Sequence, residues 1–393
     1  MAAPRQLYVD PTAGVNFATG GLTLADPYLT IQFCIDDITT SHGGRNAANG
    51  DQINVIEGVN DDILAATLDL ATVGAVYGNP AADAPLIFRG CDVYGNYGIG
   101  GIDGGAGGFS IYDGNAGATD YVHFINMHVH NTGANEILYL GNNSSAINCE
   151  INTNTASWAC VAGWDCSILD CHIYDAPAQD VLSVNNYTVV EGNMIEVDGA
   201  GRAAIFAAGT MHQIRRNLFV VNHLTAIGVK VSNTRQQVIG NSILCTVAGT
   251  GTGIFYDAVG HFGTHVRDNL IEGFSGAGGA GIDFGTSTQH IQMFANNSFF
   301  NNENDIRVAT DCDKNYDEDN DLIMAASPFL KEGALTFANR FNYFKPAIPV
   351  RGRAFPNGSR FDRGAVQVRL AVERTVAEQV IATIPERVVL DSL

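Results

Sequence analysis

Four ionisable residues recur at the same position of a repeated sequence pattern, and side chains of these types can bind metal ions or transfer protons. Each follows a residue of the pattern by one place, and they are Asp92, His128, Glu150 and His172. If successive repeats stack as strands about 4.8 Å apart, the four side chains form one outward column. Two histidines and two carboxylates at that spacing could bind a divalent metal or transfer protons. The alternative is a solvated polar column, because outward positions must be polar in any case.

A second candidate site is the acidic segment that spans residues 311–321. Its alternating ligand types have the spacing of a calcium loop, and they are Asp311, Asp313, Asn315 and Asp317. An EF-hand loop also needs glycine at its sixth position and glutamate at its twelfth, which this segment lacks. The sequence therefore predicts either an irregular Ca²⁺ site or a plain acidic loop, and Ca²⁺ is the one cofactor that we consider.

Two tryptophans, Trp158 and Trp164, flank a segment that the sequence indicates to be one turn. Exposed aromatic rings on the side of a protein can stack on sugar rings, which makes both residues candidates for carbohydrate binding. The alternative is packing in the core or in the turn, because tryptophan is highly buried on average.

The elements that position these residues follow from a ladder with the pattern apolar-x-x-(Cys/Met/Asn)-x-apolar. Its central residues are Cys91, Met127, Cys149, Cys171, Asn193, Asn217, Asn241, Asn269 and Asn297. From Met127 onward they are 22, 22, 22, 24, 24, 28 and 28 residues apart. A period in the twenties indicates a repeat architecture.

A short apolar segment follows most rungs by 9 to 13 residues. These segments are centred on Ile137, Ala159, Val181, Ile205, Ile227, Ile254, Ile282 and Ile306. They are too short and too rich in β-branched residues to be helices. Each repeat should therefore hold a bent strand pair at the ladder and one further strand, stacked as a parallel coil. Asparagine at the bend can adopt the left-handed conformation and can bond to the asparagine of the next coil.

With this ladder the chain resembles the right-handed parallel β-helix proteins of the pectate-lyase-like superfamily, over about residues 50 to 310. The residues that look like the asparagine ladder of that group are Asn193, Asn217, Asn241, Asn269 and Asn297. The resemblance implies an all-β fold, a right-handed single-stranded parallel β-helix. Residues 357–367 look similar to the closing segments of many bacterial and viral β-helix proteins. The resemblance therefore extends to phage or viral structural proteins with this fold.

Enzymes of this superfamily cleave acidic polysaccharides by lysis or hydrolysis. The resemblance implies an Arg or Lys base beside calcium-binding acids for a lyase, and Asn-Thr-Asp, Asp-Asp and Gly-His-Gly segments for a hydrolase. This chain has Gly-His-Phe-Gly at 260–263, and its Asp-Asp pairs, at 36–37 and 61–62, precede the ladder. The sequence therefore shows no complete catalytic set, and fold alone does not establish activity.

We expect four parts: an N-terminal segment and cap (1–48), the parallel β-helix (49–310), a closing segment (311–367) and a C-terminal tail (368–393). In the first part, the helical spacing of Ile31, Cys34, Ile35 and Ile38 predicts a helix that plugs the first coil. The glycine-rich residues 95–119 interrupt the ladder and indicate a surface loop. The tail has apolar residues at helical spacing, and we expect this apolar face to be buried against either the same domain or a partner chain.

Composition narrows the choice of partners. The net charge is −20, from 41 acidic and 21 basic residues, which argues against nucleic acid as a partner. The sequence has no run of 18 apolar residues that would span a membrane. The eight cysteines lack C-x-x-C spacing, so we expect mostly reduced thiols, with disulfides as the less favoured alternative.

The sequence therefore predicts a structural or adhesive protein of a larger assembly, most consistent with a virion surface protein such as a capsid decoration or tail component. A polysaccharide lyase or glycoside hydrolase is the alternative, and a polysaccharide is a candidate ligand in either case. We expect a homo-oligomer, for which a trimer is one arrangement, or attachment to other assembly proteins through the tail. The chain start shows no apolar signal-peptide segment, so we expect synthesis in the cytoplasm and a place on the virion surface, with an extracellular location as the alternative.

Overall fold

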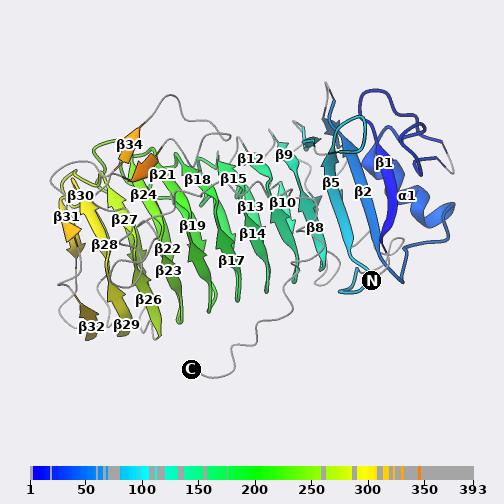
Figure 1. Ribbon diagram of the computed structural model, residues 1–393. Helices are drawn as coiled ribbons and strands as arrows, with labels where there is room; N and C mark the ends of the chain where they lie inside the picture. The colour runs from blue at the N-terminus through cyan, green and yellow to red at the C-terminus, as the bar shows by residue number, and fades with distance from the viewer. Residues whose placement is uncertain are drawn as a thin grey trace.

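The computed structural model describes residues 3–17, 20–58, 61–64, 68–69, 80–96, 98–105, 111–112, 120–131, 137–153, 157–174, 176–257, 263–285, 290–307, 313–317, 322–323, 329–331 and 344–346 of the 393-residue chain. Within these residues the chain winds repeatedly through three parallel sheets, A, B and C, and builds an elongated stack of coils (Figure 1). The expected fold, a right-handed parallel β-helix, is confirmed.

Sheet A contains the strand that enters the ladder in each coil. In the described part of the chain its twelve strands are β1 (Arg5–Val9), β2 (Asp51–Ile56), β5 (Leu86–Cys91), β8 (Val122–Ile125), β11 (Ser145–Ile147), β14 (Ser167–Leu169), β17 (Val189–Glu191), β20 (Gln213–Arg215), β23 (Gln237–Ile239), β26 (Thr264–Arg267), β29 (His290–Ala295) and β32 (Asp313–Asp317).

Sheet B contains the strand that leaves the ladder. Its eleven strands among the described residues are β3 (Asp62–Ile63), β6 (Gly100–Asp103), β9 (Met127–Asn131), β12 (Glu150–Thr153), β15 (His172–Tyr174), β18 (Met194–Val197), β21 (Leu218–Val221), β24 (Ser242–Cys245), β27 (Leu270–Glu272), β30 (Ser298–Phe300) and β33 (Leu322–Ile323).

Sheet C holds the apolar segments that were expected to form a third strand. Its ten strands within the described ranges are β4 (Leu68–Asp69), β7 (Ile111–Tyr112), β10 (Leu138–Leu140), β13 (Cys160–Ala162), β16 (Leu182–Val184), β19 (Ala203–Ala207), β22 (Ile227–Val231), β25 (Thr252–Tyr256), β28 (Ala280–Asp283) and β31 (Asn304–Arg307). The third strand per repeat is therefore confirmed.

The core lies between the three sheets and consists of stacked columns of apolar side chains. In sheet B, for example, Ile151 pairs with Ile173, which pairs with Ile195, and the column continues through Phe219 and Ile243. All five side chains are fully buried. Burying an Ile or Phe side chain contributes about 1.5–3 kcal/mol, so each coil is stabilised by contact with the coils above and below it.

The ladder residues point inward at the corner between sheets A and B. The Nδ2 of Asn217 donates to Oδ1 of Asn241 at 3.1 Å, and its backbone N–H donates to the same oxygen at 3.0 Å. Nearer the N-terminus sulfur replaces the amide, and the N–H of Cys149 donates to Sγ of Cys171 at 3.4 Å. The ladder therefore changes along the stack from weak sulfur acceptors to strong amide acceptors.

From Met127 onward, the left-handed backbone conformation belongs to the residue before the ladder position and not to the ladder asparagine itself. Asn148, Asp170 and Arg216 have φ of 53°, 54° and 57°. The expectation that the ladder asparagines themselves adopt this conformation is wrong. Their side chains are occupied by neighbouring coils, so the preceding residue makes the turn.

A second ladder occupies the corner between sheets C and A, and the sequence analysis missed it. Its members point inward on successive coils and are Ser144, Cys166, Thr188, His212, Gln236 and Thr264. The Nε2 of Gln236 donates to the backbone oxygen of Gly209 at 2.5 Å. Here too a residue with positive φ precedes the ladder position, as Tyr187 does with φ of 62°.

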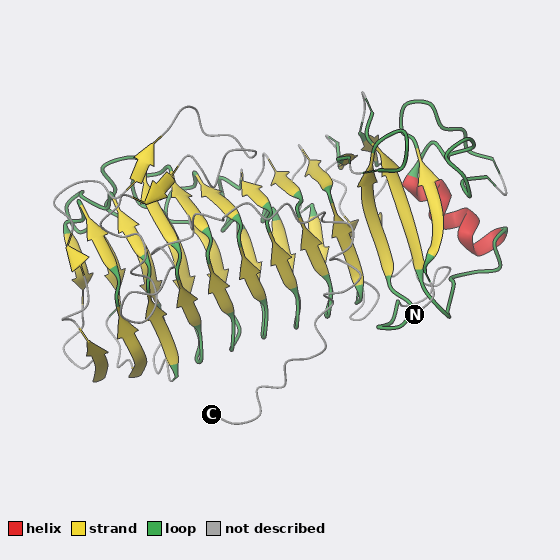
Figure 2. Cartoon of the chain, in the orientation of Figure 1, coloured by secondary structure: helices red, strands yellow, loops and turns green. Residues whose placement is uncertain are grey.

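The N-terminal end of the stack is closed by the helix α1 (Ile31–Thr40), as predicted (Figure 2). Its residues Ile31, Cys34, Ile35 and Ile38 are fully buried. The side chain of the N-cap residue Thr30 accepts a hydrogen bond from the N–H of Phe33. The segment before α1 is part of the β-helix as well as of the cap, because β1 pairs with β2 and extends sheet A.

The loop expected at residues 95–119 is wrong in part. This segment contains β6 of sheet B and β7 of sheet C, so it completes a coil of the stack. Its glycine-rich sequence hid the strands because it lacks an apolar alternation. Of the closing segment, β34 (Phe329–Lys331) and β35 (Phe344–Pro346) form an antiparallel pair, and the tail 368–393 lies outside the described residues.

Two further expectations concern cysteines and membranes. The cysteines of the described residues are buried free thiols, namely Cys34, Cys91, Cys149, Cys160, Cys166, Cys171 and Cys245. The remaining one, Cys312, lies outside the described residues. Among the described residues, no helix has the length and hydrophobicity that crossing a bilayer requires.

Candidate functional site

Strand β9 carries two histidines that point away from the core. Met127, Val129 and Asn131 of this strand are buried, and successive residues of a strand face opposite sides. His128 and His130 therefore lie on the outer face of sheet B, where their side chains are 30% and 23% exposed. Their rings stack with centroids 4.5 Å apart and planes 11° apart.

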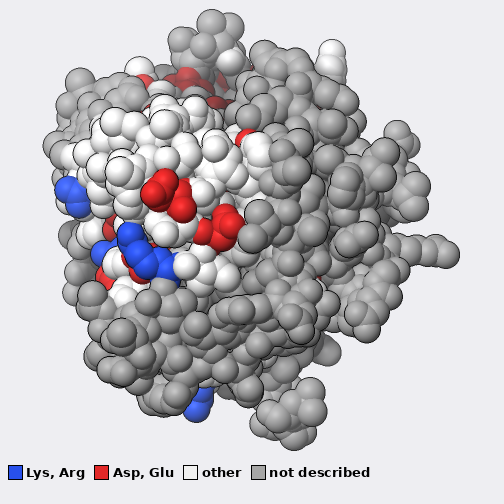
Figure 3. All heavy atoms as spheres, turned by 90° about the vertical axis from the view of Figure 1, so that its left-hand side faces the viewer, with Lys and Arg blue, Asp and Glu red and all other residues white. Residues whose placement is uncertain are grey.

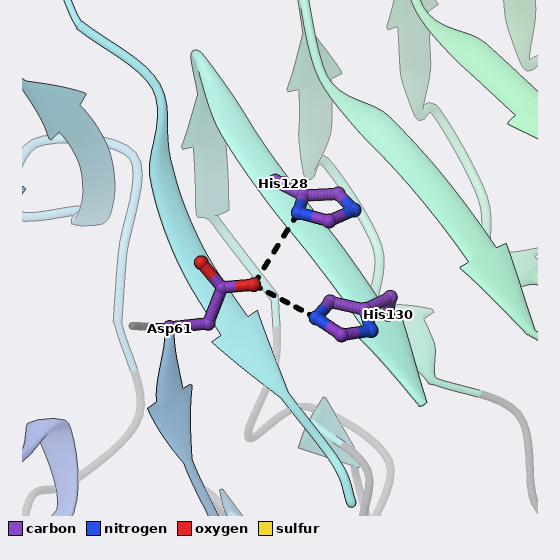
Figure 4. Close-up of side chains that lie close together, drawn as sticks. All are labelled: Asp61, His128 and His130. Atoms are coloured by element: carbon purple, nitrogen blue, oxygen red, sulfur yellow. Dashed lines mark hydrogen bonds and ion pairs between the residues drawn. The ribbon is translucent and has the colours of Figure 1, made fainter. Parts of the chain in front are cut away.

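The carboxylate of Asp61 lies against both rings, although Asp61 belongs to a different coil (Figure 4). Asp61 immediately precedes β3, and β6 separates β3 from β9 in sheet B. Its Oδ2 is 3.4 Å from Nδ1 of His128 and 2.8 Å from Nε2 of His130. The three atoms all lie within 4.8 Å of one another. We call these three residues the Asp–His–His cluster.

Gly101 of β6 allows Asp61 to reach across a whole strand. Gly101 pairs with His128, and Asp61 extends over it. A Cβ atom at Gly101 would lie 1.5 Å from Oδ1 of Asp61 and 2.0 Å from its Cγ. Any other residue at this position would displace the carboxylate, so the cluster depends on this glycine.

The two histidines stabilise the charged form of Asp61. Their hydrogen bonds, that of His128 first and that of His130 second, hold the pKa of Asp61 well below its ordinary value. The same interaction with Asp61 raises the pKa of His130. Asp103 adds a second negative charge, with its Oδ1 3.8 Å from Nδ1 of His130. The cluster therefore presents an ionised carboxylate beside two imidazoles.

The column expected from the sequence continues along sheet B. Glu150 pairs with His128 on one side and with His172 on the other, so three of the four expected residues do share a column. The Tyr174 hydroxyl donates to Oε1 of Glu150 at 2.6 Å, and Nε2 of His172 lies 2.6 Å from Oε1 of Glu196. These groups are therefore bonded to one another from coil to coil.

These side chains form one outer polar array on the first half of sheet B. Its members are Asp61, Asp103, His128, His130, Glu150, Asn152, His172, Tyr174 and Glu196. The Nδ2 of Asn152 donates to the Tyr174 hydroxyl at 2.6 Å, and the rings of His172 and Tyr174 stack 4.4 Å apart. In the described part of the chain, no lysine or arginine forms an ion pair with its carboxylates.

The outer face of sheet B changes character at β18, which carries both Glu196 of the array and the apolar Met194. Met194, Leu218, Val220, Leu244 and Leu270 are buried although they do not belong to the central core. The polar array is therefore confined to the N-terminal half of the stack.

Asp92 does not belong to the column, and the prediction that placed it there is wrong. It follows β5 in a turn, where its Oδ1 accepts hydrogen bonds from the N–H groups of Tyr94 and Asn96 at 2.9 and 2.8 Å. The position beside His128 is held by Gly101. This coil takes a longer path from the ladder into sheet B, so the one-residue offset fails there.

The two tryptophans flank a strand and not a turn, which corrects the prediction. Trp158 precedes β13 and Trp164 follows it. Trp164 is 54% exposed, whereas the indole nitrogen of Trp158 is buried. Carbohydrate stacking through these rings stays a prediction, and Trp164 is the more accessible of the two.

The expected calcium segment is only partly described. Residues 313–317 form strand β32 of sheet A, so Asp313, Asn315 and Asp317 lie on an extended backbone. Asp311 lies outside the described residues. A strand does not wrap around a cation as a loop does, so the expected loop conformation is wrong for residues 313–317. Calcium binding there stays a prediction.

Sequence reasoning found His128 but missed its partners Asp61, His130 and Asp103. The His-x-His spacing was the available signal, because residues two apart in a strand share a face. Asp61 carried no comparable local signal, since its contact with β9 depends on the bare backbone of Gly101 in the intervening strand.

Comparisons with known proteins add little to this description. No family model matches the chain, and no curated protein matches it. Among solved structures, the crystal structure of pectate lyase Pel9A is similar, with 13% sequence identity, 93% of this chain and 96% of that chain covered, and a TM-score of 0.43. At this identity and TM-score we draw no conclusion about activity from the likeness. The three parallel sheets themselves define the fold as a parallel β-helix.

Proposed function

We propose that this chain is a structural and adhesive β-helix protein of a larger assembly, namely a capsid decoration or tail protein on a virion surface. The observation that carries the proposal is that the acid–base residues of the outer polar array bond to one another. Glu150 accepts from Tyr174, and His172 is paired with Glu196. General acid–base catalysis needs a group within hydrogen-bond reach of the substrate, whereas these groups are hydrogen-bonded to protein partners.

The architecture supports the same proposal. The strands of each coil pair only with strands of the adjacent coils in the described residues, so the stack is a rod with a long lateral surface for contacts. One end is closed by α1. At the opposite end, Figure 3 shows acidic and basic atoms side by side among the described residues, and Arg307 forms an ion pair with Asp283 there. Such a rod can present a ligand-binding surface at a fixed distance from its attachment point.

The alternative, a lyase or hydrolase acting on acidic polysaccharides, has an electrostatic difficulty. The outer polar array holds the carboxylates of Asp61, Asp103, Glu150 and Glu196 without a lysine or arginine ion pair among the described residues. An anionic sugar chain would therefore be repelled by this face. A neutral glycan is the more suitable ligand for an adhesive role.

Cleavage assays test the absence of catalysis directly. We expect no product when the purified protein is incubated with polygalacturonate, alginate or neutral polysaccharides, measured by reducing ends and by the absorbance of unsaturated sugars. The decisive comparison is wild type with His128→Ala. Robust turnover that the variant loses would make the array an active site, and turnover that the variant keeps would place an active site elsewhere; either result overturns the proposal.

The assembly role has a separate test. We propose that the tail, residues 368–393, mediates oligomerisation, for which a trimer is one form, or attachment to other assembly proteins. Light scattering should show a lower mass for the chain without the tail, while circular dichroism remains that of a β protein. Antibodies against the chain should label purified virions. An unchanged mass together with unlabelled particles would contradict the assembly role.

A further inference from the structure

We propose that the Asp–His–His cluster binds one divalent transition-metal ion of the Zn²⁺ class, through Oδ2 of Asp61, Nδ1 of His128 and Nε2 of His130. The inference is independent of the proposed assembly role, since a metal can be held by a structural protein or by an enzyme.

The ligand set fits this class of metal. Imidazole nitrogen suits Zn²⁺, Cu²⁺, Fe²⁺ and Ni²⁺, whereas Ca²⁺ and Mg²⁺ prefer oxygen ligands alone. Two donors that each lie 2.0–2.1 Å from a tetrahedral ion are roughly 3.4 Å apart. The Asp61–His128 separation is 3.4 Å. The Asp61–His130 separation of 2.8 Å has to widen by about 0.6 Å as the hydrogen bond is replaced by two metal bonds.

The site is largely pre-formed by regular structure. Both histidines are on one strand, and their rings are held nearly parallel. Asp61 reaches them only because Gly101 leaves its path open. Asp103 faces the other ring nitrogen of His130 at 3.8 Å, where a carboxylate commonly orients a metal-bound histidine. Ligands on strands are held more precisely than ligands on loops, so the two histidines of β9 need little ordering on binding.

The location suggests what the ion would do. The side chains of Asp61, His128 and His130 are 30%, 30% and 23% exposed, so an ion can enter from solvent and keep a water ligand. Three protein ligands would connect β3 to β9 across β6. Coils of a β-helix otherwise contact only their immediate neighbours. The ion would thus fasten the N-terminal coils together and would leave one coordination position open.

Metal titration of the full-length protein tests the proposal. After dialysis against a chelator, we expect one equivalent of Co²⁺ to bind with the visible absorption of a nitrogen- and oxygen-ligated tetrahedral site, and Zn²⁺ to displace it. Zn²⁺ should also raise the melting temperature, because it binds the folded state. Asp61→Asn and His130→Gln should each lower the affinity at least tenfold. His172→Gln removes a histidine of the same column and should leave binding unchanged.

Gly101→Ala gives a second and sharper comparison. The atoms nearest to its added Cβ are three side-chain atoms of Asp61, so this change should displace the carboxylate and weaken Zn²⁺ binding while both histidines remain. Circular dichroism of the metal-free variants checks that they fold. If Gly101→Ala does not fold, the comparison of Asp61→Asn and His130→Gln with wild type is the test. Binding of equal strength in wild type and in the Asp61→Asn/His130→Gln double variant, less than one equivalent bound, or bound Ca²⁺ that Zn²⁺ does not displace would each overturn the proposal.

Discussion

The side-chain amide of Asn241 donates to Oδ1 of Asn269 at 3.1 Å, and the backbone N–H of Asn241 donates to the same oxygen at 3.0 Å. Asn241 accepts the equivalent pair of hydrogen bonds from Asn217. It also donates to the backbone oxygen of Ile214 at 2.9 Å. One buried side chain thus satisfies polar groups on both neighbouring coils.

Replacing Asn241 by alanine should destabilise the fold by about 3 kcal/mol, because several buried polar groups lose their partner at once. Urea unfolding monitored by circular dichroism measures the loss. Asn222→Ala is the matched control, since it removes only an exposed hydrogen bond from Thr246 and should cost less than about 1 kcal/mol. Equal losses in the two variants would contradict a special role for the buried ladder.

Tyr187 has φ of 62° and is 46% exposed. A non-glycine residue in this conformation costs about 1–2 kcal/mol, and asparagine tolerates it better. Tyr187→Asn should therefore stabilise the protein by about 0.5–1 kcal/mol. Asn143 occupies the equivalent corner position two coils earlier with φ of 57°. The control is Tyr94→Asn, because Tyr94 is 78% exposed but has no positive φ, and thermal melts should show a gain only for the first variant.

His212 is fully buried in the second ladder, and burial lowers its pKa from 6.5 to about 4. Because the folded pKa is below the unfolded value, the unfolded chain binds more protons between these pH values. The free energy of unfolding therefore falls as the pH decreases from about 6.5 to 4, and the loss reaches about 2 kcal/mol at pH 5. His212→Gln copies the Gln236 of the next coil and should abolish this component.

The His212 experiment must compare variant with wild type at each pH. Burial raises the pKa of Asp62 to about 6, and this shift has the opposite sign: the stability that it contributes is lost as the pH rises from about 4 to 6. The difference between wild type and His212→Gln cancels the Asp62 contribution. Parallel unfolding curves for the two proteins at pH 7 and pH 5 would show that His212 is protonated equally in both states.

Cys149 and Cys171 should resist alkylation in the native protein. Both thiols are fully buried, and burial raises the pKa of Cys171 well above its ordinary value. Little thiolate is then available at Cys171, and complete burial keeps the reagent away from the sulfur of Cys149. Mass spectrometry after treatment with iodoacetamide should show both residues unmodified, and the same treatment in urea should modify all eight cysteines. Rapid native labelling would place these rungs at the surface.

The sequence predicted the fold well where a residue type repeats in a fixed register. The rungs from Met127 to Asn297 and the third strand near Ile205 or Ile282 were found because inward positions must be apolar or amide. The second ladder escaped because its members, such as Thr188, His212 and Gln236, differ in type. They share only a position, and that position becomes visible only when the coils are aligned in space.

The candidate site was predicted less completely, and the reason is physical. Glu150 and His172 were placed correctly beside His128, because a strand offset of one residue is the same in regular coils. Asp92 was placed wrongly because its coil is irregular. Asp61 immediately precedes a short strand two coils away, and it reaches the histidines only because Gly101 has no side chain.

The ladder changes from sulfur at Cys149 and Cys171 to amides from Asn193 onward. The hydrogen bonds at the corners of the coils therefore differ in strength along the stack. A sulfur acceptor holds the corner N–H of Cys149 weakly, whereas amide oxygens hold those of Asn217 and Asn241 firmly. We therefore expect local opening of the stack to begin at the Cys149 corner and to reach the corners beyond Asn193 last.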